Sequence, residues 1–186
     1  QLRYFLLREV NFGQDGSFSK KNMISRINSE LANNIGNLVQ RTISFLHKQC
    51  AGVVPVIDYD MLEKLPNCTA VIDQVMDHLY RYEFSNIILL IINISSEANA
   101  YIDQSAPWVL SKTDKERMNL VIYKLLDYIR IIGILLQPII PLSAQKILDQ
   151  LRIPKEQRSL ESLCNTRISS GNVLPKPEPI FFRFDS

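Results

Sequence analysis

Asn37 and Arg41 are the two side chains whose types and spacing most directly suggest chemistry. They lie four residues apart in a stretch with helical periodicity, so their side chains are neighbours on one face of the helix. An amide beside a guanidinium can hydrogen-bond to the edge of a nucleobase. A solubilising helix face remains the alternative, because one pair of polar residues is a weak signal.

The helix that carries this pair is predicted to run from Ser19, which supplies the N-cap, to about Gln49. Apolar positions recur every three or four residues and predict one buried face, made of Ile24, Ile27, Leu31, Ile35, Leu38, Thr42 and Phe45. The opposite face is rich in amides and comprises Glu30, Asn33, Asn34, Asn37, Gln40, Arg41 and Ser44. Amides with one arginine suit base reading, whereas a lysine-rich face would mainly hold phosphates.

Trp108 is the sole tryptophan and follows Pro107 in a stretch predicted to be a loop, 104–108. A tryptophan there either plugs the end of the bundle or offers an exposed surface on which a base stacks. Such stacking contributes about 1–3 kcal/mol per base. Sequence spacing alone leaves open whether Trp108 lies beside Asn37 and Arg41.

Residues for catalysis or metal binding are scarce. The two histidines, His47 and His78, are isolated, and the sequence lacks a phosphate-binding loop and a paired zinc motif. The three cysteines are far apart and odd in number: Cys50, Cys68 and Cys164. We therefore predict no catalytic site and no metal site on this chain, and reduced structural thiols.

The remaining patterns predict an all-α fold, a bundle of five or six helices with a short extended C-terminal tail. Helices are expected at 1–10, 19–49, 67–82, 85–103, 113–136 and 141–151, with a short one at 160–163. Ser85 is a plausible N-cap, and Thr113 with Glu116 forms a predicted capping box. Asp58 or Asp60 is expected to cap a short turn through Leu65, and 181–184 to pack on the bundle through its aromatics.

Composition and charge narrow the function further. The 186 residues are 46% hydrophobic with a net charge of only +2, which fits one globular domain and argues against a protein that coats nucleic acid. The apolar runs 87–94 and 129–142 are too short or too interrupted to span a bilayer. We expect no membrane and no DNA partner. The opening residues look like the end of a helix already under way, so the chain is expected to be a piece of a longer protein.

Several motifs together resemble methionyl-tRNA synthetases. The segment 3–10, followed by 12–16, resembles the connection from that family's catalytic core to its anticodon-binding domain. Leu31-Ala32-Asn33 and Gly36-Asn37-Leu38 with Arg41 are similar to its first anticodon-domain helix. The family's loop signature is matched by Ala106-Pro107-Trp108 with Tyr101, Asp103 and Gln104 before it. Residues 171–184 resemble the C-terminal segment of family members.

The resemblance implies a helical bundle that recognises the CAU anticodon of methionine tRNAs. Trp108 would stack on the first anticodon base, Asn37 and Arg41 would contact bases, Pro107 would shape the platform, and Asp103 would organise the loop. It also implies three parts: 1–18 as the end of the connector, 19–153 as the anticodon-binding bundle, and 154–186 as a terminal segment that packs on the bundle.

The parent protein would be a cytoplasmic ligase that joins methionine to tRNA with ATP. Its catalytic domain, which would hold ATP, Mg²⁺ and often Zn²⁺, is missing here, so the expected partners are tRNA(Met) and that domain. The alternatives are the anticodon domain of another class I synthetase, for leucine, isoleucine, valine or cysteine, or a helical protein-interaction module that is anchored by Trp108.

Overall fold

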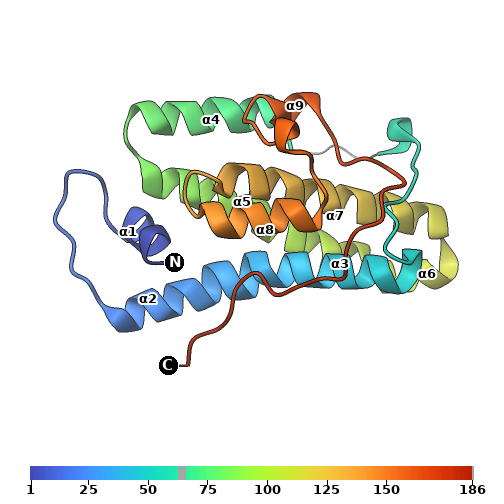
Figure 1. Ribbon diagram of the computed structural model, residues 1–186, viewed down its shortest axis with the longest axis horizontal. Coiled ribbons are helices and arrows are strands. Elements are labelled where there is room, and N and C mark those ends of the chain that lie inside the picture. Colours follow the sequence, from blue (N-terminus) through green and yellow to red (C-terminus); the bar gives the residue numbers. More distant parts are fainter. Residues whose placement is uncertain (63–65, 186) are drawn as a thin grey trace.

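The computed structural model describes residues 1–62 and 66–185, and these form a bundle of helices (Figure 1). Within these residues the sole pairing of extended segments is one isolated bridge between Val53 and Val173. The predicted all-α bundle is therefore confirmed. Among the same residues, none of the helices is both long and apolar enough to cross a membrane.

One long helical segment crosses the lower side of the bundle in Figure 1. It consists of α2 (Lys20–Arg26), the π-helical η1 (Ile27–Gly36) and α3 (Asn37–Cys50), which follow each other without a break. Ser19 caps it as predicted, since its hydroxyl accepts a hydrogen bond from the Asn22 N–H at 3.3 Å. The π-helical stretch was not predicted, because its buried residues Ile27, Leu31 and Ile35 are four apart, a spacing that an ordinary α-helix also gives.

Two other long helices form the centre. They are α5 (Phe84–Ser105) and α7 (Lys115–Leu136), which pack against each other, and α7 also packs on α8 (Pro141–Gln150). α1 (Leu2–Glu9) lies at one end of the bundle and α6 (Pro107–Thr113) at the other (Figure 1). The remaining helices are α4 (Cys68–Tyr80), α9 (Ser162–Asn165), η2 (Tyr59–Met61) and η3 (Lys155–Gln157).

The prediction of a loop at 104–108 is wrong. α5 continues to Ser105, one residue with left-handed backbone follows (Ala106, φ 42°), and Pro107 starts α6. Proline fits the first position of a helix, because its missing N–H would have had no partner in that turn. The backbone leaves the right-handed helical region at Ala106 alone, so no loop opens before the proline.

Two predicted caps are also wrong. Glu83 occupies the N-cap of α5, so Ser85 falls in the first turn and donates its hydroxyl to Asn11. Thr113 is the last residue of α6, so the capping box does not form, and the carboxylate of Asp114 caps α7 by accepting from the Arg117 N–H at 2.9 Å. The N-cap needs extended backbone, which Asp114 has and helical Thr113 lacks.

The remaining helix caps and the C-terminal segment agree better with the predictions from sequence. Asp58, one of the two predicted caps, caps η2, and Asn67, where a helix was expected to begin, caps α4. The expected end of the turn at Leu65 lies outside the described residues. The C-terminal segment runs along the long helical segment α2–η1–α3 (Figure 1), where Asn28 of η1 exchanges two 2.9 Å hydrogen bonds with the backbone of Phe184. Phe181 is buried as expected, but Phe182 and Phe184 are exposed.

A buried ion pair joins α7 to the C-terminal part of the chain. Arg130 and Asp127 have no exposed side-chain area and pair with each other on α7. Arg130 also donates to the Leu163 carbonyl at 3.1 Å, and Arg167 lies 3.6 Å from Asp127. Removing one member of such a pair leaves a buried charge without compensation.

We expect Asp127→Ala to lower the free energy of unfolding by about 3–5 kcal/mol, because Arg130 would lose its counter-charge in the core. Asp77→Ala is the matched control, since Asp77 pairs with Arg81 at 2.9 Å with both side chains exposed. That variant should change stability by less than about 0.5 kcal/mol. Urea unfolding followed by circular dichroism measures both, and equal losses would contradict the assignment.

Candidate nucleic-acid interface

Arg41 and Trp108 line the same cavity, of about 330 Å³, where α3, α5, α6 and α7 meet. The other lining residues are Thr42, Ser44, Phe45, Lys48, Ile102, Pro107, Ile122 and Leu125. The structure thus answers the question that sequence spacing left open: these two side chains are neighbours. The floor of the cavity is mainly apolar, and its polar groups come from α3.

Trp108 occupies the first turn of α6, directly after the buried Pro107. Its side chain is 47% exposed, so one part of the indole contacts the bundle while the rest faces solvent. The left-handed backbone of Ala106 turns the chain between α5 and α6 and thereby sets where the indole is presented. Trp108 is therefore available as a stacking surface instead of being a plug in the core.

Arg41 forms an ion pair with Asp103, whose carboxylate lies 2.9 Å from the guanidinium. Asp103 lies in the last turns of α5, so the loop that it was expected to organise does not exist, and its observed contact is with Arg41. Asp103 is largely exposed and Arg41 partly so, and pairs of this kind contribute about 0–1 kcal/mol. Asp103 thus orients the Arg41 guanidinium through an ion pair that is weak enough for a more strongly bound ligand to displace.

Asn37 is exposed at the first position of α3, one turn before Arg41. It does not line the cavity, so the structure unites Arg41, Pro107 and Trp108 there but leaves Asn37 on the adjoining surface. Arg41 is shared between the cavity and this surface, because residues four apart project from the same side of a helix.

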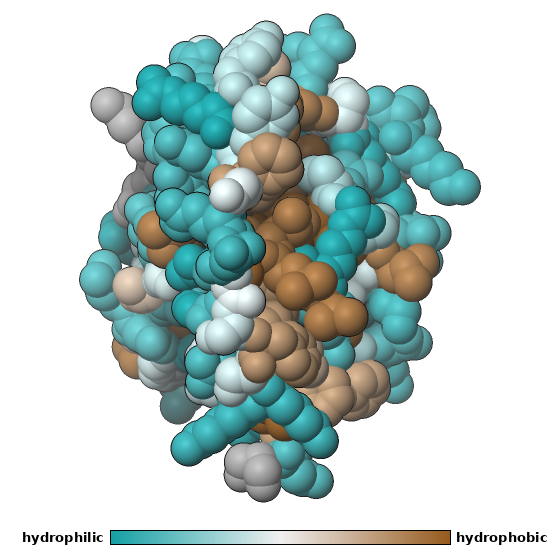
Figure 2. All heavy atoms as spheres, turned by 90° about the vertical axis from the view of Figure 1, so that its left-hand side faces the viewer, coloured by the Kyte–Doolittle hydropathy of each residue, from teal (hydrophilic) through white to brown (hydrophobic). Residues whose placement is uncertain are grey.

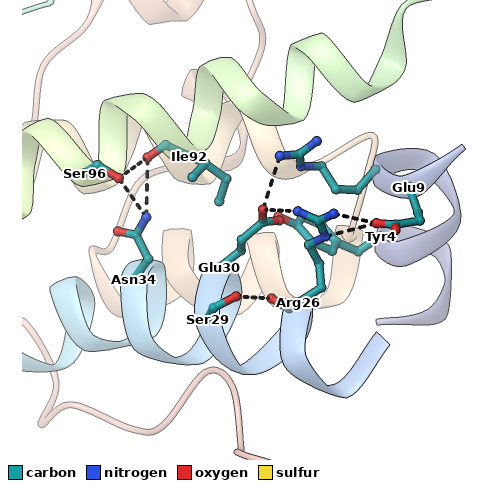
Figure 3. Close-up of polar contacts among 9 residues, drawn as sticks. Tyr4, Glu9, Arg26, Ser29, Glu30, Asn34, Ile92 and Ser96 are labelled. Carbon is teal, nitrogen blue, oxygen red and sulfur yellow. Dashed lines mark hydrogen bonds and ion pairs between the residues drawn. The ribbon is translucent and has the colours of Figure 1, made fainter. Parts of the chain in front are cut away.

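The amide-rich face is only partly a solvent face. The Asn34 side-chain carbonyl accepts from Ser95 at 2.9 Å and from Asn99 at 2.8 Å. Its amide donates to Ser96 at 3.0 Å, as Figure 3 shows. All three partners are on α5. Asn34 therefore joins η1 to the helix that carries Asp103, a contact that the sequence pattern did not reveal.

A second polar cluster joins η1 to α1. Tyr4 donates its hydroxyl to Glu30 at 2.6 Å, and Glu30 also pairs with Arg8 and Arg26 (Figure 3). Burial raises the pKa of Tyr4 well above its usual range, and the hydrogen bond to Glu30 raises it further, so the hydroxyl keeps its proton and donates. Glu30, placed on the polar face by its spacing, is thus a contact between helices.

Among residues 1–62 and 66–185, His, Cys, Asp and Glu side chains form no group of three or more that could hold a metal ion. His47 contacts the Pro175 carbonyl and His78 contacts Glu83, so both histidines make structural hydrogen bonds. The three cysteines are free thiols, and burial raises the pKa of the Cys50 and Cys68 thiols. Neither thiol is activated as a nucleophile.

Sequence reasoning missed four residues of the cavity on α3: Thr42, Ser44, Phe45 and Lys48. Lys48 follows Arg41 by seven residues, or about two helical turns, so extending the face of Arg41 would have found it. Thr42 was assigned to the buried stripe and is indeed buried. No signal in the sequence distinguishes it from a core position.

A helical bundle that presents an exposed tryptophan next to an arginine on a neighbouring helix, with no metal or nucleophile cluster in its described part, fits the anticodon-binding domains of class I tRNA synthetases. A family model described as the anticodon binding domain of methionyl tRNA ligase matches residues 58–185, and one described as tRNA synthetases class I (M) matches 1–43. The chain belongs to the methionyl-tRNA ligase family. It carries the anticodon-binding domain with a small part of the catalytic domain.

Individual relatives support the assignment to this family. Methionine–tRNA ligase of Rickettsia felis is 44% identical over all of this chain, and that of Brucella suis is 38% identical over 99% of it. The structure of apo methionyl-tRNA synthetase from Mycobacterium tuberculosis superposes with a TM-score of 0.89 at 35% identity, over 100% of this chain and 39% of that one. The chain spans 38% of the Rickettsia felis protein and 36% of the Brucella suis protein.

Because Trp108 is the sole tryptophan, its fluorescence reports on this site alone. We expect acrylamide to quench the emission of the native chain readily, since the indole is 47% exposed. Quenching of the urea-unfolded chain gives the fully accessible reference. Strong protection in the native chain, far from that reference, would place the ring in the core and contradict the assignment.

Proposed function

We propose that this chain reads the CAU anticodon of methionine tRNAs on behalf of a methionine–tRNA ligase. Trp108 stacks on the first anticodon base, and Asn37 and Arg41 hydrogen-bond to base edges. Membership of the family supports the tRNA partner. The observation that carries the residue assignment is the shared cavity, where a half-exposed indole and a guanidinium face the same space.

The supporting residues follow from the geometry. Pro107 is buried at the start of α6 and holds the tryptophan platform in place. Asp103 orients the Arg41 guanidinium, and its negative charge disfavours a phosphate at the same position. Recognition through a few base contacts also agrees with a net charge of +2, since a binder that relies on many phosphates needs a larger positive field.

The activity of the whole protein is proposed from its relatives. It attaches methionine to tRNA with ATP, in the cytoplasm, and the groups that bind ATP, Mg²⁺ and Zn²⁺ belong to the part of the ligase outside this chain. The Mycobacterium tuberculosis enzyme, 36% identical to this chain, has been solved in complex with methionyl-adenylate. The division of this chain at residues 18 and 153 stays a prediction.

The second partner that we propose is the catalytic domain of the same protein. An apolar groove of about 1110 Å³ lies on the α1 side of the bundle, away from α6, and brown side chains gather on this face in Figure 2. Its lining includes Leu2, Leu6, Leu79, Ile134, Pro138 and Leu160. The catalytic domain is the occupant, because residues 1–43, which include α1, match the class I synthetase family model.

Trp108→Ala should weaken binding of a CAU stem-loop by about 1–3 kcal/mol, because the stacking surface is lost. Fluorescence anisotropy of a labelled stem-loop measures the affinity. Val109→Ala is the control: Val109 is exposed on the same helix but does not line the cavity, so its loss should change little. Equal affinities of the wild type and Trp108→Ala would refute the stacking role, and a wild type that binds no stem-loop would favour the protein-interaction module.

Arg41→Ala should cost about 1–3 kcal/mol on the CAU stem-loop and less on a stem-loop with an unrelated anticodon, since a base contact carries sequence information. Arg81→Ala is the matched control, because Arg81 is an exposed arginine paired to Asp77. The same loss on both stem-loops would make Arg41 a phosphate anchor instead.

The groove is tested with Leu79→Asp in the full-length ligase. Leu79 is exposed here and lines the groove, so we expect aminoacylation to fall while the chain of 186 residues keeps its stem-loop affinity. Tyr80→Asp is the control on the next residue, which is exposed outside the groove. Unchanged aminoacylation by Leu79→Asp would overturn the docking proposal.

A further inference from the structure

Thr42 has a hydroxyl that the fold leaves without a partner. The residue is only 1% exposed, and its Oγ1 makes no hydrogen bond within the described part of the chain. It follows Arg41 directly and lines the same cavity as Trp108. A buried polar group without a partner is unfavourable, and each case in a native structure calls for an explanation.

Other threonines of this chain show what a helical threonine ordinarily does. Thr113 donates to the Val109 carbonyl at 3.2 Å, and Thr166 donates to the Ser162 carbonyl at 2.8 Å, each four residues back. That bond satisfies the hydroxyl within its own helix. Thr42 lies within α3, yet makes no such bond to its own helix. Valine would fill the same space without a buried hydroxyl, so packing alone does not account for a threonine here.

We propose that the Thr42 hydroxyl is a binding contact for the edge of the anticodon base that stacks on Trp108. The base enters the 330 Å³ cavity with its ring against the indole, and its edge reaches the α3 wall. A hydroxyl both donates and accepts, so it pairs with the amino group or with a ring acceptor of cytosine. The inference rests on the proposed function and adds a residue to that site.

The base reaches this hydroxyl only when a lining side chain moves, because Oγ1 has almost no contact with solvent. Trp108 is the lining aromatic with the greatest exposure, and its helix starts directly after the left-handed turn at Ala106. Its indole shifts outward as the base enters, while Pro107 stays buried at the start of α6. The Thr42 hydroxyl then gains a hydrogen bond in the complex, whereas in the unbound protein it is buried without a partner.

The test compares Thr42→Val and Thr42→Ser in the 186-residue chain. Two stem-loops are used as probes, one with the CAU anticodon and one with an abasic first anticodon nucleotide. We expect Thr42→Val to bind CAU about five- to tenfold more weakly, the scale of one neutral hydrogen bond. Thr42→Ser should stay within about twofold, because it keeps the hydroxyl.

The abasic stem-loop and thermal unfolding separate this contact from a structural effect. On the abasic probe, wild type and Thr42→Val should bind equally, because the base that the hydroxyl contacts is gone. The melting temperature of Thr42→Val should equal or exceed that of the wild type, since the variant buries a methyl group in place of an unpaired hydroxyl. An equal loss on both probes, or a lower melting temperature, would overturn the proposal.

The outcomes also distinguish this inference from the proposed function. If Trp108→Ala weakens CAU binding and Thr42→Val does not, the stacking site stands and the Thr42 contact is refuted. If the wild type fails to bind the CAU stem-loop, both are refuted together. Loss of affinity in Thr42→Val, with rescue by Thr42→Ser and no effect on the abasic probe, supports both.

Discussion

The hydrogen bonds of Asn34 with α5 are the contact on which the geometry of the site depends. Asn34 lies in the π-helical η1, one turn before Asn37, and its side chain engages Ser95, Ser96 and Asn99. Hydrogen bonds are directional, so this junction sets the register of two helices that apolar packing alone would allow to slide. Asp103 is four residues beyond Asn99 on α5. The pairing of Arg41 with Asp103 therefore depends on the register that Asn34 sets.

The two proposed binding sites lie at opposite ends of the bundle. The cavity with Arg41 and Trp108 lies towards α6, and the apolar groove lies on the α1 side (Figures 1 and 2). Between them, α7 is buried along most of its length, and its Asp127–Arg130 pair connects it to the C-terminal part of the chain. A close-packed interior moves as a unit. The proposed anticodon site is thus kept at a fixed distance from the proposed docking groove.

Agreement between sequence and structure was best where one local signal decides the outcome. Ser19 caps its helix as predicted, and so does Asp58, one of two predicted candidates, because a short polar side chain before a helix bonds within its own turn. Agreement failed where two local signals compete. Pro107 can end one helix or begin another, and it begins α6 because Ala106 alone makes the turn. Thr113 and Asp114 are both good caps, and the length of α6 decided in favour of Asp114.

The sequence by itself determined the helical class, the family resemblance and the candidates Asn37, Arg41, Pro107, Trp108 and Asp103. Helical periodicity and helix-capping residues are local, and family motifs are a matter of residue identity. Only the tertiary structure decided that Arg41 and Trp108, 67 positions apart in the chain, share a cavity, and that Asn37 lies outside it. It alone showed that Thr42 is buried without a hydrogen-bond partner. The reason is physical: which side chains meet is set by how helices pack, and periodicity defines the face of a helix but not the neighbour that covers it.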